Sequence, residues 1–307
     1  MTLFDRAIVS VLPAVPKRVV RRISSRYIAG TDVQDACRVV SRLNQAGQMA
    51  TIDVLGEEIT SVDEATGIVR EYRYVFETIE REYLDSNVSV KPTALGLKLS
   101  ESLFRRNLDQ VVSHASEIGN FVRIDMEDSS TTDVTLRVYR ELREAGLDNV
   151  GIVLQAYLRR TLDDIRALAD LKPNVRLCKG IYVEPTEVAY QDFGEVRANF
   201  VAALAELLDG GAYVGIATHD DWLIEEGKRL VAEHRRERDE YEFQMLLGVR
   251  ERVGAALVEE GHRLRIYVPY GEQWYAYSLR RLQENPKIAG YIATDTLGRL
   301  VPGRNGS

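Results

Sequence analysis

Features that would mark a metal-binding, nucleic-acid-binding or membrane-spanning protein are scarce in this sequence of 307 residues. Only two cysteines occur, Cys37 and Cys178, which are too few for a disulfide framework and lack the paired spacing of zinc ligands. The formal net charge is −7, so we expect no basic face for nucleic acid. No apolar run is long enough to cross a bilayer. We therefore expect a protein of a reducing compartment that binds neither metal nor nucleic acid.

The N-terminal segment does not have the pattern of a secretory signal. Its apolar stretch from Ala7 to Val15 is interrupted by Pro13 and preceded by the acidic Asp5. Four arginines follow closely: Arg18, Arg21, Arg22 and Arg26. We interpret them as a solvated helix face rather than a membrane-surface anchor, and we expect the protein to be cytoplasmic.

Short β-rich runs alternate along the chain with segments of helical periodicity. The eight runs are 49–57, 96–100, 121–127, 150–157, 175–182, 213–220, 242–248 and 262–271. The helical segments between them include 134–145, 162–171, 195–208 and 221–234. Alternating strand and helix units of this length imply parallel strands joined by right-handed crossovers.

The predicted fold class is α/β, a (β/α)8 barrel in one domain that spans residues 1–307. A barrel of about 250 residues with additions fits this length. A doubly wound sheet would usually carry a glycine fingerprint after its first strand, and no G-x-G-x-x-G occurs. Residues 1–45 are expected to form extra N-terminal helices, residues 46–290 the barrel, and residues 274–284 a helix after the eighth strand.

The strands alternate apolar and charged residues, although parallel barrels are normally packed inside with aliphatic side chains. In the run 121–127, Arg123 and Asp125 lie on the face opposite Val122 and Ile124. The same parity places further polar residues inside: Asp53, Lys98, Glu127, Arg176, Tyr182, Arg263, Arg265 and Tyr267. Burying an unpaired charge is costly, so these groups must pair or face a polar ligand. We predict an active site at the C-terminal ends of the strands, where barrel enzymes hold their chemistry.

Several motifs, taken together and in consistent order from about Ala29 to Pro286, resemble the proline dehydrogenase family, and its small monofunctional bacterial members in particular. The motifs are G-L-K-L-S at 96–100, R-I-D-M-E at 123–127, Q-A-Y-L at 155–158, R-L-C-K-G-I-Y at 176–182, A-T-H-D at 217–220, E-F-Q-M-L at 242–246, R-I-Y-V-P-Y-G at 265–271 and Y-A-Y-S-L-R-R-L at 275–282. Each motif alone is weak, but the set is specific.

The resemblance implies a distorted (β/α)8 barrel of the TIM type with a substrate-binding helix after strand eight. It implies noncovalent FAD and hydride transfer from L-proline to flavin N5, which yields Δ1-pyrroline-5-carboxylate in the first step of proline catabolism. It also implies that electrons pass to a membrane quinone, with a peripheral contact at the inner face of the cell membrane. The residues that align with the family's substrate pocket are Lys98, Asp125, Tyr182, Leu246, Tyr267, Tyr277, Arg280 and Arg281. The residues that align with its flavin contacts are Gln155, Arg176, Lys179, Gly180, Thr218, His219 and Glu284.

The residue types suit this chemistry. Arg280 and Arg281 can clamp the carboxylate of proline. Arg176 can place positive charge near N5, where electron density gathers on the flavin. Lys98 and Asp125, predicted on neighbouring strands, should point into one cavity and pair as opposite charges.

Two other functions suit a polar barrel. Lys98 or Lys179 could serve as the Schiff-base lysine of a class I aldolase, but the arginine pair and Gln155 would then have no task. A non-catalytic barrel that binds a polar ligand would keep the cavity and need no electron acceptor. Bound flavin in the purified protein would distinguish the dehydrogenase from both.

Overall fold

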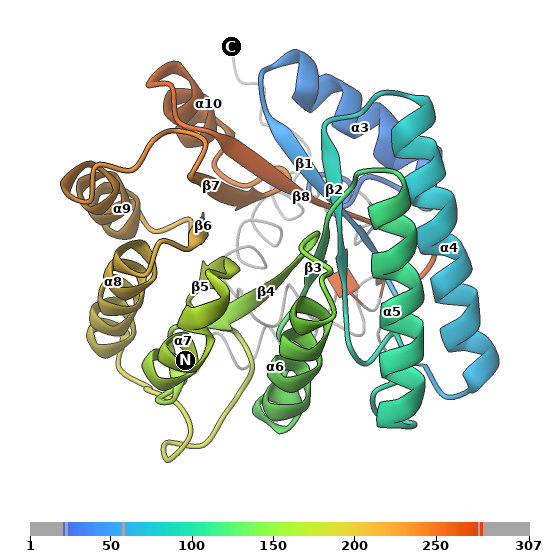
Figure 1. Ribbon diagram of the computed structural model, residues 1–307. Helices are drawn as coiled ribbons and strands as arrows, with labels where there is room; N and C mark the ends of the chain where they lie inside the picture. Colours follow the sequence, from blue (N-terminus) through green and yellow to red (C-terminus); the bar gives the residue numbers. More distant parts are fainter. Residues whose placement is uncertain (1–20, 22–23, 57–58, 276, 279–307) are drawn as a thin grey trace, which may run out of the picture.

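Eight parallel strands close into a barrel in the order of the sequence, and helices surround them (Figure 1). The computed structural model describes residues 21, 24–56, 59–275 and 277–278. The strands are β1 (Met49–Val54), β2 (Ser86–Val90), β3 (Val122–Ile124), β4 (Val150–Gln155), β5 (Asn174–Cys178), β6 (Tyr213–Ala217), β7 (Tyr241–Leu246) and β8 (Leu264–Tyr270). The predicted (β/α)8 barrel is confirmed.

A helix follows each of the first seven strands and packs on the outside of the barrel. The helices are α3 (Val33–Gln45), α4 (Val62–Arg81), α5 (Glu101–Glu117), α6 (Ser129–Glu144), α7 (Thr161–Leu168) with the short η2 (Ala169–Leu171), α8 (Phe193–Asp209), α9 (Asp221–Glu233) and α10 (Glu251–Glu259). Helix α3 precedes the barrel and packs against β1 and β8. Within the described residues, no helix combines the length and apolar character needed to cross a bilayer.

The second strand lies ten residues before the predicted one. The run 96–100 was expected to be a strand, but residues 92–99 form consecutive turns and the strand is β2. Gly96 has φ +103°, a left-handed conformation that interrupts any extended run, and its carbonyl accepts the backbone N–H of Ser100 (3.0 Å). The prediction was wrong because Leu97, Lys98 and Leu99 alternate like a strand.

The barrel has an apolar outer layer and a polar interior, as the alternation predicted. Ile52, Ile124 and Phe243 point outward and are buried beneath the helices. The helices supply the opposite side of this layer through apolar residues at helical spacing, such as Tyr72 and Phe76 of α4. Apolar packing therefore holds the strands from outside, which leaves the inner positions free for polar groups.

The floor of the barrel is polar and is built around the guanidinium of Arg123. Arg123 is 2% exposed, and its Nη1 donates to the carbonyls of Ile152 (3.0 Å) and Asn174 (2.6 Å). Gly151 lies opposite Arg123 in the ladder, and a side chain there would occupy the space of the guanidinium. Burial and the charge of Arg176 lower the pKa of Arg123 to about 9, so the group remains protonated at neutral pH.

Candidate active site

Asp125 is the centre of a polar cluster at the C-terminal end of the barrel. Its Oδ1 accepts hydrogen bonds from Ser89 Oγ (2.6 Å) and Arg176 Nη1 (2.7 Å). Its Oδ2 accepts the hydroxyl of Tyr267 (2.9 Å) and lies 3.4 Å from Nζ of Lys91. Because the carboxyl ends of parallel strands meet at one rim, β2, β3, β5 and β8 bring these groups together.

Lys91, directly after β2, supplies the cation that was predicted from Lys98. Its Nζ lies 2.8 Å from both carboxylate oxygens of Asp53 and donates to the hydroxyl of Tyr267 (3.0 Å). Lys91 is 7% exposed, whereas Lys98 is exposed in the turns before α5. The predicted pairing of Lys98 with Asp125 is therefore wrong. The run 86–92, in which valines alternate with small polar residues before Lys91 and Pro92, was the signal in the sequence that could have predicted this strand and its lysine.

The pKa values in this cluster fix which groups donate and which accept. Burial by itself would raise the pKa of Asp125, but the charges of Lys91 and Arg176 and the hydrogen bonds from Ser89 and Tyr267 hold it below its ordinary value. Burial and the nearby carboxylates raise the pKa of Tyr267 well above its ordinary value. Asp125 is thus an anion and Tyr267 a neutral donor at neutral pH.

Arg176 connects the cluster to the floor of the barrel. Its Nε donates to Oε1 of Gln244 (2.5 Å), and Nε2 of Gln244 donates to Glu242 (2.5 Å). Glu242 also accepts Nε of Arg265 (2.8 Å) and the hydroxyl of Tyr213 (2.7 Å). Burial opposes the charge of Glu242, but these donors keep its pKa below the ordinary value. The interior therefore holds ionised groups that are paired with one another.

The similarities to known proteins agree with this geometry. A family model described as Proline dehydrogenase matches residues 36–293. The chain belongs to the proline dehydrogenase family. It is 42% identical over 267 residues to "Proline dehydrogenase 1" of Bacillus subtilis subsp. natto, covering 87% of this chain and 88% of that protein. It is 37% identical over 279 residues to "Proline dehydrogenase" of Deinococcus radiodurans, covering 90% of each chain.

A solved structure of the family's fold also matches. The crystal structure of proline utilization A (PutA) from Bdellovibrio bacteriovorus, inactivated by N-propargylglycine, superposes with a TM-score of 0.83 at 26% identity. The match covers 92% of this chain and 36% of the PutA chain, so this chain corresponds to about a third of that protein. The expected family and its barrel are thereby confirmed.

The described residues aligned with the family's flavin contacts lie on or directly after three adjacent strands, β4, β5 and β6. Gln155 is buried and donates to the carbonyl of Glu127 (2.9 Å). Thr218 Oγ1 accepts the backbone N–H of Asp220 (3.1 Å), and His219 Nε2 accepts that of Leu246 (3.0 Å). The structure thus places them on one side of the rim, next to Arg176 of β5, and what they bind stays a prediction.

Two further positions of this set follow β5. Lys179 Nζ lies 3.3 Å from a carboxylate oxygen of Asp220. Gly180 has φ +101°, and a Cβ there would collide with the ring of Tyr157. Only glycine accommodates both this backbone conformation and this close packing. A residue with a side chain at position 180 would therefore force the chain after β5 onto a different path.

The remaining predicted substrate residues are described in part. Tyr182 is half-buried in the loop after β5, and Leu246 ends β7. Tyr277 is buried against Ile28 and Leu55, in a small apolar cluster. Three predicted residues lie outside the described residues and remain predictions: Arg280, Arg281 and Glu284.

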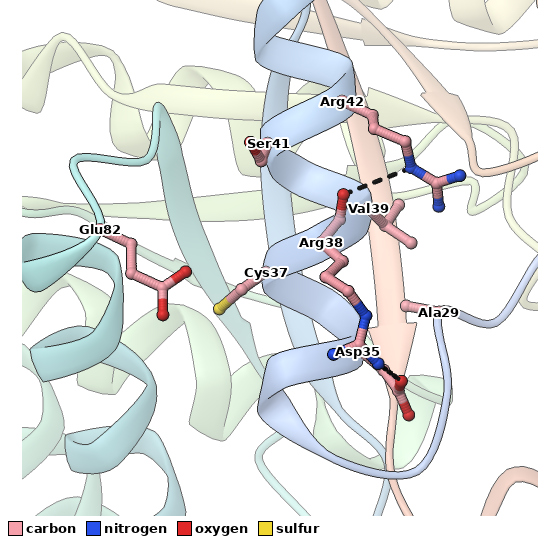
Figure 2. Close-up of a pocket in the computed structure, with 8 residues that line it drawn as sticks. All are labelled: Ala29, Asp35, Cys37, Arg38, Val39, Ser41, Arg42 and Glu82. Atoms are coloured by element: carbon pink, nitrogen blue, oxygen red, sulfur yellow. Dashed lines mark hydrogen bonds and ion pairs between the residues drawn. The ribbon is translucent and has the colours of Figure 1, made fainter.

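A separate hollow of about 560 Å³ lies outside the barrel, beside α3 (Figure 2). Arg38 pairs there with Asp35, and Nε of Arg42 donates to the carbonyl of Arg38 (3.3 Å). Burial, followed by the charge of Glu82, raises the pKa of Cys37 to about 11, so its thiol is not a nucleophile at neutral pH. No residue predicted for the active site lines this hollow.

Proposed function

We propose that this protein is an FAD-dependent dehydrogenase that oxidises L-proline to Δ1-pyrroline-5-carboxylate and passes the electrons to a quinone. The main support is the buried cluster around Asp125 at the barrel mouth, in a chain that belongs to the proline dehydrogenase family. We further propose a cytoplasmic protein that meets the quinone through a peripheral contact with the membrane. Noncovalent binding of FAD is part of the proposal.

The groups along the rim fit FAD. Arg176 donates through Nε and Nη1, while its Nη2 has no hydrogen bond with any described residue and stays available to a ligand. Lys179 adds a second cation at the end of the same strand. Amide and hydroxyl groups complete the set on neighbouring strands. The residues proposed to hold FAD are Gln155, Arg176, Lys179, Gly180, Thr218 and His219, with Glu284 from the predicted last helix.

The opposite part of the rim is proposed to hold proline. FAD, when bound, accepts the hydride that leaves C5 of the substrate. Tyr267 links the two sides, since its ring lies 5.2 Å from the guanidinium carbon of Arg176 and its hydroxyl bonds Asp125. We propose that Lys91 and Asp125 hold this ring in place and that Arg280 and Arg281 bind the carboxylate.

The aldolase alternative gains no support from the geometry. A Schiff-base lysine must lose its proton, which neighbouring cations or an apolar pocket promote. Lys91 lies between two carboxylates, and Lys179 pairs with Asp220. Each of these two lysines therefore has an anionic partner, and neither has the purely apolar or cationic surroundings that this chemistry needs. Lys98, the other candidate, is exposed outside the cavity.

The test is anaerobic reduction of the purified protein by L-proline. We expect flavin absorption in the protein as purified or after incubation with FAD, and bleaching of that absorption by L-proline. A quinone incorporated in vesicles should then restore the absorption, and the protein should sediment with those vesicles. The proposal is refuted if no flavin binds, or if bound flavin is not reduced by L-proline.

A further inference from the structure

We propose that Gln244 is a positioning residue that sets the orientation of the Arg176 guanidinium at the flavin site. Gln244 lies on β7 and is 6% exposed. It belongs to the motif at 242–246 but was not among the residues aligned with the family's substrate pocket or flavin contacts. The inference rests on the proposed contact between Arg176 and FAD, and the experiment below separates the two.

The orientation of the Gln244 amide follows from its neighbours. An arginine side chain can only donate hydrogen bonds, and an ionised carboxylate can only accept them. Oε1 of Gln244 must therefore face Nε of Arg176 (2.5 Å), and Nε2 must face Oε1 of Glu242 (2.5 Å). Among the uncharged residue types, only a side-chain amide of this length supplies an acceptor and a donor in these two directions.

A glycine between the two strands makes this contact feasible. Arg176 on β5 and Gln244 on β7 are not on neighbouring strands, because β6 lies between them. Gly215 of β6 pairs with Arg176 on one side and with Glu242 on the other. A Cβ at Gly215 would collide with the Gln244 amide. The missing side chain is thus the space through which Gln244 reaches Arg176.

Gln244 and Asp125 hold two different edges of the same guanidinium. Nη1 of Arg176 donates to Asp125 (2.7 Å) and Ser89 (3.2 Å), while Nε donates to Gln244. Two anchors define the plane of the group and hence the direction of Nη2. With the Gln244 anchor lost, Nε would be buried without an acceptor and the guanidinium could rotate about its bonds to Asp125 and Ser89.

The amide also separates Arg176 from a second anion. Glu242 is ionised and paired with Arg265 at the floor of the barrel. Because Gln244 lies between Glu242 and Arg176, the positive charge of Arg176 stays directed toward the barrel mouth. A charge fixed there in advance stabilises electron density that arrives during the reaction without reorganisation.

The experiment compares Gln244→Met and Gln244→Glu with Arg176→Met, and uses the exposed Gln34→Met on α3 as the matched control. The measurements are the FAD dissociation constant, the midpoint potential of bound FAD, and kcat and KM for L-proline. Gln244→Met should make the potential more negative and lower kcat by about 10- to 100-fold, with a smaller change in KM. Gln34→Met should match the wild type.

Gln244→Glu gives a pH signature that a purely structural role would not produce. The introduced carboxyl faces Glu242, and two carboxyl groups in contact hold one proton between them. In its protonated form it can accept from Arg176 and donate to Glu242, as the amide does. The kcat of this variant should therefore approach the wild type at low pH and fall as the pH rises, beyond any change in the wild type.

Gly215→Ala provides an independent perturbation if Gln244→Met does not fold. It should shift the midpoint potential in the same direction because it displaces the Gln244 amide. Wild-type potential and kcat in the Gln244 variants, together with altered values in Arg176→Met, would overturn the positioning role alone. Wild-type values in Arg176→Met would overturn the proposed flavin contact of Arg176, and the positioning role with it.

Discussion

Replacing Lys91 by methionine should destabilise the protein strongly, while the same change at Lys98 should not. Lys91 is 7% exposed and lies between the carboxylates of Asp53 and Asp125. Asp53 is fully buried, so it cannot compensate for the loss of its cation by turning to water. Methionine keeps most of the volume of the side chain, which limits the change to the lost charge and its hydrogen bonds.

The expected loss follows from the cost of leaving a buried charge without its partner. Removing one member of a buried ion pair typically costs about 3–5 kcal/mol, a large part of the roughly 5–15 kcal/mol by which a domain is stable. An exposed lysine usually contributes within about 0.5 kcal/mol. We therefore expect a loss of about 3–5 kcal/mol in Lys91→Met and less than about 0.5 kcal/mol in Lys98→Met.

The pH dependence gives the sign of the effect. In the wild type the pKa of Asp125 is depressed, so its contribution to stability is present above the ordinary carboxyl range and is lost as the pH falls through the folded-state pKa. Without Lys91 that depression is smaller. The stability difference between the wild type and Lys91→Met should thus be largest near neutral pH and should narrow in acid.

Urea denaturation at several pH values measures this difference, with Lys98→Met as the control. The double variant Lys91→Met/Asp53→Asn should recover part of the loss, because it removes one anion together with the cation. Equal stability of the Lys91 and Lys98 variants at neutral pH would refute the reasoning. A double variant less stable than the sum of the single changes would refute the assigned pairing with Asp53.

Two further variants test the loop after β5. Gly180→Ala should lower the free energy of unfolding by more than the roughly 1–2 kcal/mol of a left-handed backbone, because its Cβ also meets the ring of Tyr157. Gly119→Ala is the control, since Gly119 has φ +66° and open space around it. Thermal denaturation should show a smaller loss of stability for Gly119→Ala. Equal losses would contradict this. Glu184→Gln should weaken the two hydrogen bonds that the carboxylate accepts from Ser129 (both 2.7 Å), which anchor the loop. We expect faster proteolysis of the loop and a higher KM for L-proline. An unchanged digestion pattern and KM would contradict this anchoring role of Glu184.

The barrel could be predicted because its strands carry two signals at once. The outward residues are apolar and the inward ones polar, and every predicted run except 96–100 overlaps an observed strand. β2 was not predicted because its inward residues, Asn87 and Ser89, are small and uncharged. The residues in the turns around Lys98, in contrast, alternate between apolar and polar as a strand would. Several predicted runs extended past the true strand ends because polar residues such as Asp125 and Glu127 continue the alternation beyond the strand.

The alternation of side chains along a strand predicts which charged residues point inward, but not which of them pair inside the barrel. Arg123 and Asp125 both point inward on neighbouring positions of the same face, yet Asp125 pairs with Arg176 at the mouth while Arg123 donates to backbone carbonyls at the floor. The depth of each side chain depends on the stagger between strands, which a local pattern does not contain. The contact between Gln244 and Arg176 could not be predicted for a related reason, since it depends on Gly215 of another strand.

The pairing inside the barrel bears on how the site is prepared for a ligand. At the mouth, Lys91 and Arg176 balance Asp53 and Asp125, and deeper down Arg265 balances Glu242. These ion pairs are formed among side chains of the protein itself, which orients their charges inside the barrel. A site whose dipoles and charges are already oriented has little reorganisation left to perform during the reaction. The internal ion pairs of this barrel are thus compatible with catalysis, because Asp125 fixes the orientation of both the Arg176 guanidinium and the Tyr267 ring.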